Sequence, residues 1–490
     1  MSYTVKRKNR KTGKTYIYET TSVWDKELKQ PRQISRYIGI AKKKGEIQLK
    51  KEKPRVKVAQ SFGDVYFLKE IAKQLKLNVC LNEIFGEKIG SQLLELAIFK
   101  AIKSDSFYLY EDWSEAKPID NTLSSQDISK ILSELEPYEF FKKWCELNNK
   151  QSVVYYDITS ISTYSAYNLL AERGYNRDKE NLNQLNLGIV SSAEDELPLF
   201  YNLYPGSISD VSTLDNVLKF TKLYKLKDII FVLDCGFFSQ SNIKNLLKNK
   251  VNFIVRLNPS TNEYKRLVSE FEEISTNIIS LNKEGYYYEK EIVKFKGEKV
   301  VAFTFHSESK KAFEFNKSSN KLNEVDEYLK DNNAKDLKEY LEKHSLKNFF
   351  NEDCTKKIKP QIAKELQSMG KFVLLPNPCK TSALKILTHY RNREHSEKIF
   401  DNLKTELGYD RLRTHSTKSA QGTIFVSFIA VILYTNIISK TKNLKLTVPE
   451  ILNSLANLQK FCVSDKEYFF SEITRKNKNI FENFGIESPI

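Results

Sequence analysis

One predicted helix constrains this chain most, because it has to bury an apolar face while it presents polar side chains on another. Segment 389–413, HYRNREHSEKIFDNLKTELGYDRLR, carries four of them at offsets of 0, 3, 7 and 14 residues: Tyr390, Arg393, Glu397 and Lys404. A helix turns by about 100° per residue, so these four fall within roughly 60° around the axis. A carboxylate beside two cations suits a metal-bound, phosphate-rich substrate. A solvated amphipathic helix with charge pairs is the alternative interpretation.

Two aspartates farther upstream are each predicted to end a buried strand. The apolar run of VVYYDITS (153–160) ends at Asp157, and that of DIIFVLDCGFFS (228–239) ends at Asp234. Short β-branched and aromatic runs followed by polar residues are typical of strands. Rigid strand ends often present catalytic side chains, although a single aspartate there is more commonly a turn residue. Together with Glu397, the two aspartates form a hard-oxygen ligand set for two Mg²⁺ or Mn²⁺ ions about 4 Å apart.

These segments resemble the DDE transposases of bacterial insertion sequences. The resemblance is to the group with the signature Y-x2-R-x3-E-x6-K, which the four residues of the predicted helix meet without a gap. RGYNRDKENLNQLNLGIV (173–190) and ELPLFYNLYPGSISDVSTL (196–214) are similar to the stretches that the family carries between its aspartates. Lys179-Glu180 and Ser207 depart from the His-Arg and Asn that relatives often have there. These departures affect local DNA contacts, for which Arg177 and Lys179 are candidates.

The resemblance implies a fold, an activity and partners. The fold is α/β, with a ribonuclease-H-like mixed sheet, flanking helices and a β-rich insertion. The activity is cleavage and joining of insertion-sequence ends, with Asp157, Asp234 and Glu397 holding two Mg²⁺ or Mn²⁺ ions. The remaining signature residues, Tyr390, Arg393 and Lys404, would position the terminal nucleotides. The implied partners are double-stranded DNA, as terminal inverted repeats and target, and a second copy of the chain in a homodimeric synaptic complex.

The order of predicted elements divides the chain into five parts. They are a basic β-rich module (1–57), a helical domain that is a further candidate for DNA binding (58–150), a catalytic core (151–258 and 372–440), a β-rich insertion (259–371) and a helical C-terminal tail (441–490). The first core segment is predicted as strand, helix, strand, strand, helix, strand, helix, strand. The apolar run FVLLPN (372–377) predicts the strand by which the chain returns to the core after the insertion.

Positive charge is concentrated at the N-terminus. Residues 1–57 contain eighteen basic and five acidic residues, and so hold +13 of the net charge of +16. Such a segment suits binding to a phosphate backbone, for which the candidates are Arg7, Arg10, Arg32 and Arg36. A merely solvated basic tail is the alternative, but TYIYETTSVWD and RQISRYIGI alternate like strands.

Cysteine usage and hydropathy bear on the compartment. The six cysteines are scattered without a C-x-x-C pair, which argues against a zinc site and a disulfide framework. The polar N-terminus does not have the apolar core of a signal peptide. Segment 423–439, TIFVSFIAVILYTNIIS, falls short of the ~20 residues of a membrane span and is predicted as a buried core helix. We therefore expect a cytoplasmic, nucleoid-associated bacterial protein without a membrane partner.

Other functions remain open from the sequence. A structure-specific DNA nuclease of the same fold would share the three acids but would not join strands. A non-catalytic DNA-binding derivative would bind DNA without needing Mg²⁺. A glycosidase with paired carboxylates would explain neither the basic N-terminal segment nor the cations beside Glu397.

Overall fold

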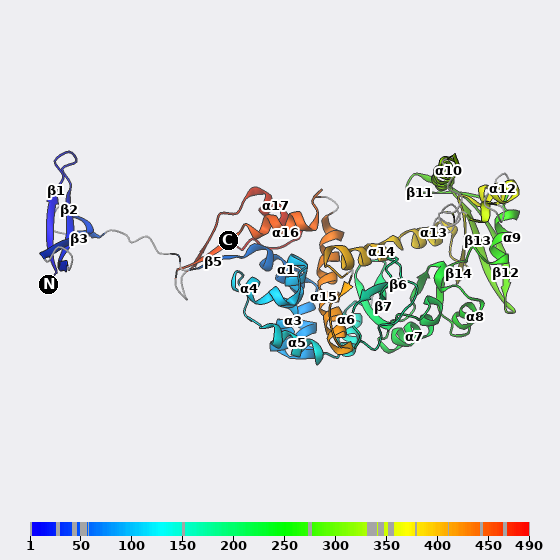
Figure 1. Ribbon diagram of the computed structural model, residues 1–490, viewed down its shortest axis with the longest axis horizontal. Helices are drawn as coiled ribbons and strands as arrows, with labels where there is room; N and C mark the ends of the chain where they lie inside the picture. The colour runs from blue at the N-terminus through cyan, green and yellow to red at the C-terminus, as the bar shows by residue number, and fades with distance from the viewer. Residues whose placement is uncertain are drawn as a thin grey trace. The chain divides into compact units, whose positions relative to one another are not determined.

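The computed structural model divides the chain into two compact units (Figure 1). The first contains residues 1–59 and 460–471, and the second contains 60–459 and 472–490. The structure describes the chain except for residues 1, 26–29, 42–46, 50–55, 57, 149–151, 273–276, 331–340, 342–346, 351–356, 378–379, 410, 442–443, 464–467 and 490.

The first unit is built on an antiparallel sheet in the order β1-β2-β3-β4. Its strands are β1 (Ser2–Lys8), β2 (Thr15–Asp25), β3 (Gln30–Ala41) and β4 (Ile47–Leu49). The alternating segments TYIYETTSVWD and RQISRYIGI lie in β2 and β3, so the two predicted strands are confirmed. β16 (Gln459–Cys462) and β17 (Tyr468–Phe470) pair antiparallel.

The second unit is organised around one mixed sheet. Its main order is β11-β12-β13-β14-β10-β9-β6-β7-β8, and β15 pairs with β6 off this path. β9 is parallel to both β6 and β10, whereas the other neighbours along the main order are antiparallel. The strands are β6 (Val153–Thr163), β7 (Asn183–Ser192), β8 (Pro198–Pro205), β9 (Ile230–Leu233), β10 (Asn252–Arg256), β11 (Asn277–Leu281), β12 (Glu284–Phe295), β13 (Glu298–His306), β14 (Lys371–Asn377) and β15 (Arg411–Leu412). The return strand predicted at 372–377 is confirmed as β14.

The insertion does not form a sheet of its own. β13 pairs antiparallel with β14, from Phe303 opposite Leu374 to His306 opposite Lys371, so β11, β12 and β13 extend the central sheet. The same segment also contains helical elements, α9 (Asn262–Glu270), α10 (Glu308–Lys330), η4 (Lys347–Phe349) and α12 (Lys359–Ser368). Segment 259–371 therefore contributes strands to the central sheet and contains helices as well.

Two details of the predicted core are wrong. The helix expected between the first two core strands is an extended loop over residues 164–182, with one isolated bridge between Glu172 and Gln184. Asp157 lies within β6 rather than at its end, since the strand continues to Thr163. The polar residues that follow Asp157 are buried within the strand, namely Thr159, Ser160 and Ser162. Asp234, by contrast, directly follows β9, as predicted.

The predicted helix over 389–413 is in fact three helical segments and a strand. α13 (Ala383–Arg391) ends before a turn at 392–393, α14 (Glu394–Asp401) follows, and η5 (Asn402–Glu406) is a π-helical turn. Arg411 and Leu412 leave the helix and pair with β6 as β15. The helix begins earlier than predicted because Ser382 caps it by accepting from the backbone N–H of Lys385.

Helices cover the rest of the unit. The helical domain contains α1 (Gly63–Gln74), α2 (Leu77–Phe85), α3 (Glu87–Lys103), η1 (Phe107–Leu109), α4 (Tyr110–Glu115), α5 (Ser125–Ser133) and α6 (Tyr138–Leu147), after the short strand β5 (Val58–Ser61). The core adds α7 (Asp210–Leu223), η2 (Cys235–Phe237) and α8 (Gln240–Lys248), and the C-terminal segment adds α16 (Val448–Ala456) and α17 (Arg475–Asn483). α5 and α16 begin at capping boxes, Ser124 with Asp127 and Thr447 with Glu450, so their start points follow from the sequence.

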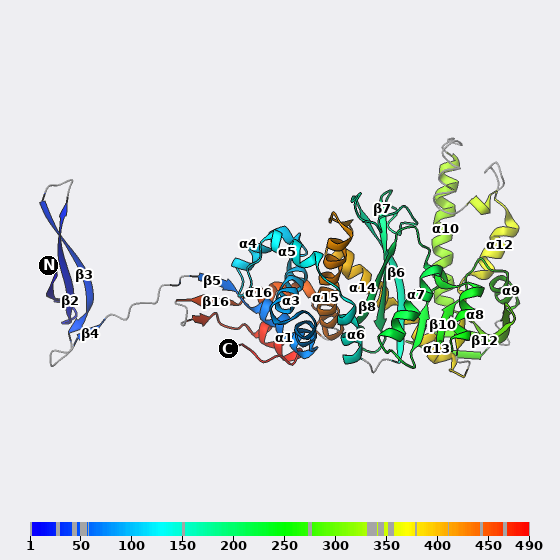
Figure 2. The ribbon, with the colours of Figure 1, turned by 90° about the horizontal axis from the view of Figure 1, so that it is seen from below.

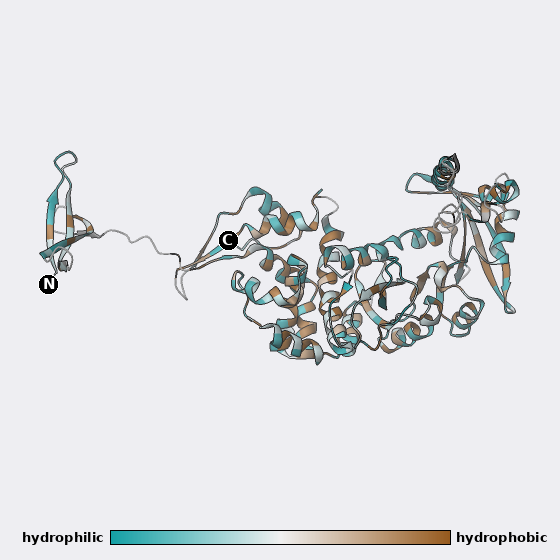
Figure 3. Cartoon of the chain, viewed as in Figure 1, coloured by the Kyte–Doolittle hydropathy of each residue, from teal (hydrophilic) through white to brown (hydrophobic). Residues whose placement is uncertain are grey.

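The longest apolar helix, α15 (Thr417–Thr441), joins the helical domain to the sheet. It packs against α3 and α5 on one side and against β8 on the other (Figures 1 and 2). Its length and composition would allow it to cross a membrane, but 89% of its most apolar window is buried inside the protein. Figure 3 shows the apolar character of this helix. Segment 423–439 is thus the core helix that was predicted.

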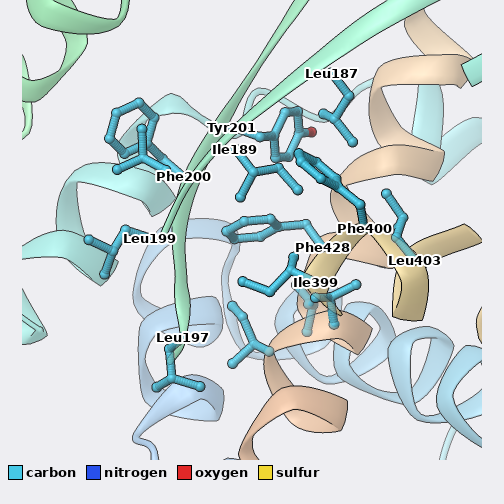
Figure 4. Packing of buried hydrophobic residues seen from close by; sticks show 14 of the residues in the cluster. Leu187, Ile189, Leu197, Leu199, Phe200, Tyr201, Ile399, Phe400, Leu403 and Phe428 are labelled. Carbon is cyan, nitrogen blue, oxygen red and sulfur yellow. The ribbon is translucent and has the colours of Figure 1, made fainter. Parts of the chain in front are cut away.

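A cluster of apolar side chains fixes α14 on the sheet. Ile399, Phe400 and Leu403 are buried and belong to the same cluster as Leu187 and Ile189 of β7 (Figure 4). Phe428 of α15 closes the cluster from the helical side. Burying this apolar side orients α14, and its opposite side carries Glu397.

Candidate active site

Three carboxylates predicted from the sequence come together at the centre of the sheet. β6 and β9 run parallel with Tyr155 opposite Val232, so Asp157 and Asp234, each two residues farther on, reach the same edge. Glu397 comes from α14, which packs beside β6. The convergence follows from strand direction, because parallel neighbours present equivalent positions at the same edge.

One guanidinium group connects all three carboxylates. Arg393 Nη1 lies 3.0 Å from Asp157 Oδ2, and Arg393 Nη2 lies 2.9 Å from Glu397 Oε1 and 3.9 Å from Asp234 Oδ2. The arginine side chain is only 13% exposed. A planar guanidinium with five donors can serve several carboxylates at once, which an ammonium group does less well.

Tyr390 completes the group on the side of Asp234. Its hydroxyl donates to Asp234 Oδ1 at 3.2 Å, and its ring stacks on Phe372 of β14 with centroids 6.1 Å apart. Burial raises the pKa of this phenol to about 12. The hydroxyl therefore stays protonated near neutral pH and can donate a hydrogen bond to an anionic partner.

Two more ion pairs line the opening beside the carboxylates. Lys404 Nζ lies 2.5 Å from Asp178 Oδ2. Arg177 Nη2 donates to both carboxylate oxygens of Asp210, at 2.6 and 2.7 Å. Neither Asp178 nor Asp210 was predicted to belong to the site. The signal for Asp210 was its place at the end of PGSISD, within the segment 196–214 that resembles the transposase family.

These groups surround one cavity of about 410 Å³, which we call the carboxylate pocket. It is lined by Asp157, Ile158, Thr159, Arg177, Asp178, Asp210, Asp234, Gly236, Phe237, Arg393, Glu397, Phe400, Asp401 and Lys404. Acids from five separate segments and cations from two therefore face one space, an arrangement that suits a charged substrate.

Comparison with known proteins identifies the family. The model of the transposase DDE domain matches residues 148–433, which is more than half of the chain. The chain belongs to this family. Membership supports a DNA transposase, and the mixed α/β sheet with flanking helices agrees with the fold class predicted from the sequence.

Two other comparisons complete this result. Among solved structures, the chain is similar to the cryo-EM structure of a piggyBac transposase synaptic complex with hairpin DNA. The TM-score is 0.34 and the identity 8%, over 82% of this chain and 76% of that chain. No curated protein matches the chain.

The electrostatics of this transposase-family pocket centre on Asp157. Burial raises the pKa of its carboxyl to about 6, against the opposing effect of Arg393. For Arg393, burial lowers the pKa, but the nearby charges of Asp234 and Asp157 outweigh burial and raise it overall. The arginine is therefore permanently charged, and Asp157 is the group of this pair that can change its protonation state.

The donor set of the pocket fits a hard divalent cation. Carboxylate oxygens are the ligands that Mg²⁺ and Mn²⁺ prefer, and a partly buried carboxylate without full solvation gains most from a cation. Within the described ranges, no three acids, imidazoles or thiols are grouped closely enough for a ready metal site. The guanidinium of Arg393 lies among the three carboxylates and offsets part of their negative charge.

The other predicted DNA-contacting residues lie outside this pocket. Lys179 is exposed on the loop between β6 and β7, next to Asp178, and has a left-handed backbone with φ of 59°. The four N-terminal arginines belong to the first compact unit and are exposed there: Arg7 on β1, Arg10 in the following turn, and Arg32 and Arg36 on β3.

Proposed function

We propose that this chain is a DNA transposase that cleaves and joins the ends of a bacterial insertion sequence. It would belong to the group with the Y-x2-R-x3-E-x6-K signature. The observation that carries the proposal is the contact of Arg393 with three carboxylates from distant segments, Asp157, Asp234 and Glu397. This arrangement brings the signature helix to the two acids that the resemblance pairs with it.

In this proposal the three acids hold two Mg²⁺ or Mn²⁺ ions. When bound, such ions neutralise charge on the scissile phosphate and favour attack by water or a DNA 3′-hydroxyl. Asp157 has to be ionised to act as a ligand, so its raised pKa makes protons compete with the metal and should weaken metal binding as the pH falls.

The neighbouring cations would hold the DNA rather than the metal. Arg393 can grip a phosphate with two parallel hydrogen bonds, and Lys404 can act on another as a point charge. Tyr390, which remains protonated, donates a hydrogen bond beside them. Positioning of this kind accounts for a large share of the rate in reactions that form no covalent enzyme intermediate.

The remaining parts of the proposal concern architecture and partners. Residues 151–258 and 372–440 would form a ribonuclease-H-like core interrupted by the insertion 259–371. Residues 1–57, with Arg7, Arg10, Arg32 and Arg36, would bind duplex DNA, with a contribution from 58–150, while 441–490 form a C-terminal tail. The DNA would be terminal inverted repeats and target, held by a homodimer in the bacterial cytoplasm.

The direct test is incubation of the purified protein and Mg²⁺ with DNA that carries the ends of its own element. We expect nicking at the element boundary followed by joining of the freed 3′-hydroxyl to target DNA. Nicking without joining would favour a structure-specific nuclease. Specific binding that needs no Mg²⁺ and leads to no cleavage would favour a non-catalytic DNA-binding derivative.

A further inference from the structure

The loop between β6 and β7 holds several large side chains in solvent. Tyr164, Tyr167 and Tyr175 are 69%, 77% and 84% exposed, and Leu169 is as exposed as Tyr175. Single exposed apolar side chains are ordinary, but four within twelve residues concentrate exposed apolar surface on one loop, which we call the patch, and such surface often marks a binding site.

Hydrogen bonds to the rest of the protein hold the loop that carries this patch in place. The backbone N–H of Leu169 donates to Thr417 Oγ1 at 2.8 Å, and the buried side chain of Gln184 donates to the carbonyl of Tyr175 at 3.0 Å. Ser165 Oγ donates to the carbonyl of His415 at 2.5 Å. The loop is thus fastened to α15, to β7 and to the segment before α15.

Two glycines fix the turn that presents Tyr175. A Cβ on Gly174 would overlap the carbonyl oxygen of Gly206, and a Cβ on Gly206 would overlap the carbonyl oxygens of Gln184 and Glu172. Backbone therefore packs directly on backbone here. The backbone that carries Tyr175 is therefore fixed before any partner binds.

The patch lies next to the carboxylate pocket. Beyond Tyr175 the chain turns back along β6, where Asn176 Nδ2 donates to Ser162 Oγ and the Arg177 N–H donates to Ser160 Oγ, each at 3.0 Å. Ser162 is five residues from Asp157 on the same strand, which corresponds to roughly 17 Å. Arg177 then lines the pocket itself.

Cations accompany the tyrosines. The guanidinium of Arg411 lies 5.6 Å from the centre of the Tyr164 ring and donates to its hydroxyl at 3.1 Å. Arg173, Lys179 and Arg413 are exposed, and in the part of the chain that the structure describes they form no salt bridge. Aromatic faces interleaved with cations are the pattern of surfaces that hold unpaired nucleic acid, where bases stack on rings and phosphates meet cations.

We propose that Tyr164, Tyr167 and Tyr175 bind unpaired nucleotides of a DNA strand beside the cleavage pocket. The partner is single-stranded rather than duplex DNA, because a base offers its flat face to a side chain only when it is unstacked. This inference rests on the proposed function, since that function brings the strand to the pocket. It places the DNA strand next to the cleavage site on a surface that is separate from Tyr390, Arg393 and Lys404.

The test measures binding of the full-length protein in EDTA, so that cleavage does not interfere. The probes are a fluorescent oligothymidine of about 8 nucleotides, within the usual site size, and a duplex with no unpaired end. Tyr167→Leu and Tyr175→Leu should each weaken oligothymidine binding by roughly fivefold or more and leave duplex binding unchanged. Tyr167→Phe and Tyr175→Phe keep the stacking ring and should bind as the wild type does.

Phe313→Leu supplies the matched control, because the aromatic ring of Phe313 on α10 is 68% exposed and lies outside the patch and outside the segments proposed to bind DNA. Equal losses on both probes would overturn the proposal in favour of a duplex backbone contact. Unchanged oligothymidine binding would also overturn it, and a changed oligomeric state in the same variants would then assign the patch to a second copy of the chain.

The two proposals fail in different ways. If the wild type cleaves the ends of its element while the leucine variants bind oligothymidine normally, only the tyrosine surface is refuted. If oligothymidine binding depends on the tyrosines but the wild type does not cleave such ends, the tyrosine surface stands as an unpaired-DNA site and the transposase proposal fails.

Discussion

Arg393 donates a hydrogen bond from Nη1 to Asp157 Oδ2 at 3.0 Å, across 236 positions of the sequence. Its Nη2 donates to Glu397, one turn farther along the same helical segment. A single side chain therefore connects the middle of β6 to α14. In that position the guanidinium competes with any other cation for the same carboxylate oxygens, and this competition can be measured.

Replacing Arg393 with alanine should tighten the binding of Mn²⁺ to the DNA-free protein, because a competing cation is removed from three carboxylates. Titration followed by Mn²⁺ electron paramagnetic resonance measures this affinity. Cleavage and strand transfer should nevertheless fall, since the side chain that positions the phosphate is absent. Lys404→Ala is the control, because Lys404 pairs with Asp178 and its removal should leave Mn²⁺ affinity nearly unchanged. Weaker Mn²⁺ binding by Arg393→Ala would refute the competition.

Asp157→Asn should abolish cleavage while specific binding to element ends stays nearly intact, because the substitution removes a metal ligand and leaves the basic surface in place. Nicking and gel-shift assays on the same preparation test this. Asp234→Asn should behave in the same way. Cleavage above about a hundredth of the wild-type rate would exclude the altered residue as a metal ligand.

The raised pKa of Asp157 predicts a pH-dependent stability difference between wild type and Asp157→Asn. The folded-state pKa of about 6 exceeds the unfolded value of 3.8, so folding favours the neutral acid. The contribution of the neutral acid to the stability of the wild type is fully present below about pH 4 and is lost as the pH rises through 6. The asparagine variant should therefore match the wild type at acid pH and exceed it above pH 6, by at most about 3 kcal/mol. Thermal unfolding of both proteins across this range measures the difference, and parallel curves would contradict it.

Glu397 and Glu394 provide a matched pair on α14. Glu397→Gln should remove both Mg²⁺- and Mn²⁺-supported cleavage, because its carboxylate faces the pocket and contacts Arg393. Glu394→Gln should retain substantial activity, since Glu394 is exposed and does not line the pocket. Asp401→Asn, in the pocket wall, should also stay active. An inactive Asp401→Asn with an active Glu397→Gln would transfer the ligand role to Asp401.

The N-terminal arginines should contribute to the slope with which DNA affinity falls as salt concentration rises. Changing Arg7, Arg10, Arg32 and Arg36 to alanine should reduce the log–log salt slope by up to about 3.6, or roughly 0.9 for each phosphate that is no longer neutralised. Deletion of residues 1–57 should flatten the slope at least as much. A variant without the exposed cations Arg475, Lys476 and Lys478 of α17 is the control. An unchanged slope in the arginine variant would make the module a structural or protein-contact element.

Much of the core could be predicted because its signals are local. The apolar runs that became β6, β9 and β14 are short, those of β6 and β9 are also rich in β-branched residues, and the alternation in β2 and β3 has a period of two residues. Asp157 and Asp234 were predicted for the same reason, since each follows or interrupts such a run. Arg393, Glu397 and Lys404 were found by their spacing.

The predictions that failed concern turns, loops and strand pairings, which depend on residues that are close in space but distant in sequence. The turn at 392–393 interrupts a segment with unbroken helical periodicity, and the pairing of β15 with β6 pulls 411–412 out of the helix. The loop at 164–182 replaces a predicted helix because its backbone is held by the side chains of Ser160 on β6, Gln184 on β7 and Thr417 on α15. Asp178 and Asp210 were not predicted as site residues because the cations that pair with them, Lys404 and Arg177, are distant in sequence.

The residues that line the carboxylate pocket belong to segments that are translated far apart in time. Asp157 and Asp234 emerge early, whereas Arg393, Glu397 and Lys404 follow only after the whole insertion has been synthesised. The basic strands of the first unit are made before any of them. A nascent chain, or a copy of the gene truncated within the insertion, therefore carries the basic strands and four of the six pocket acids but no complete pocket. Any chemistry of this pocket is withheld until translation has reached the last fifth of the chain.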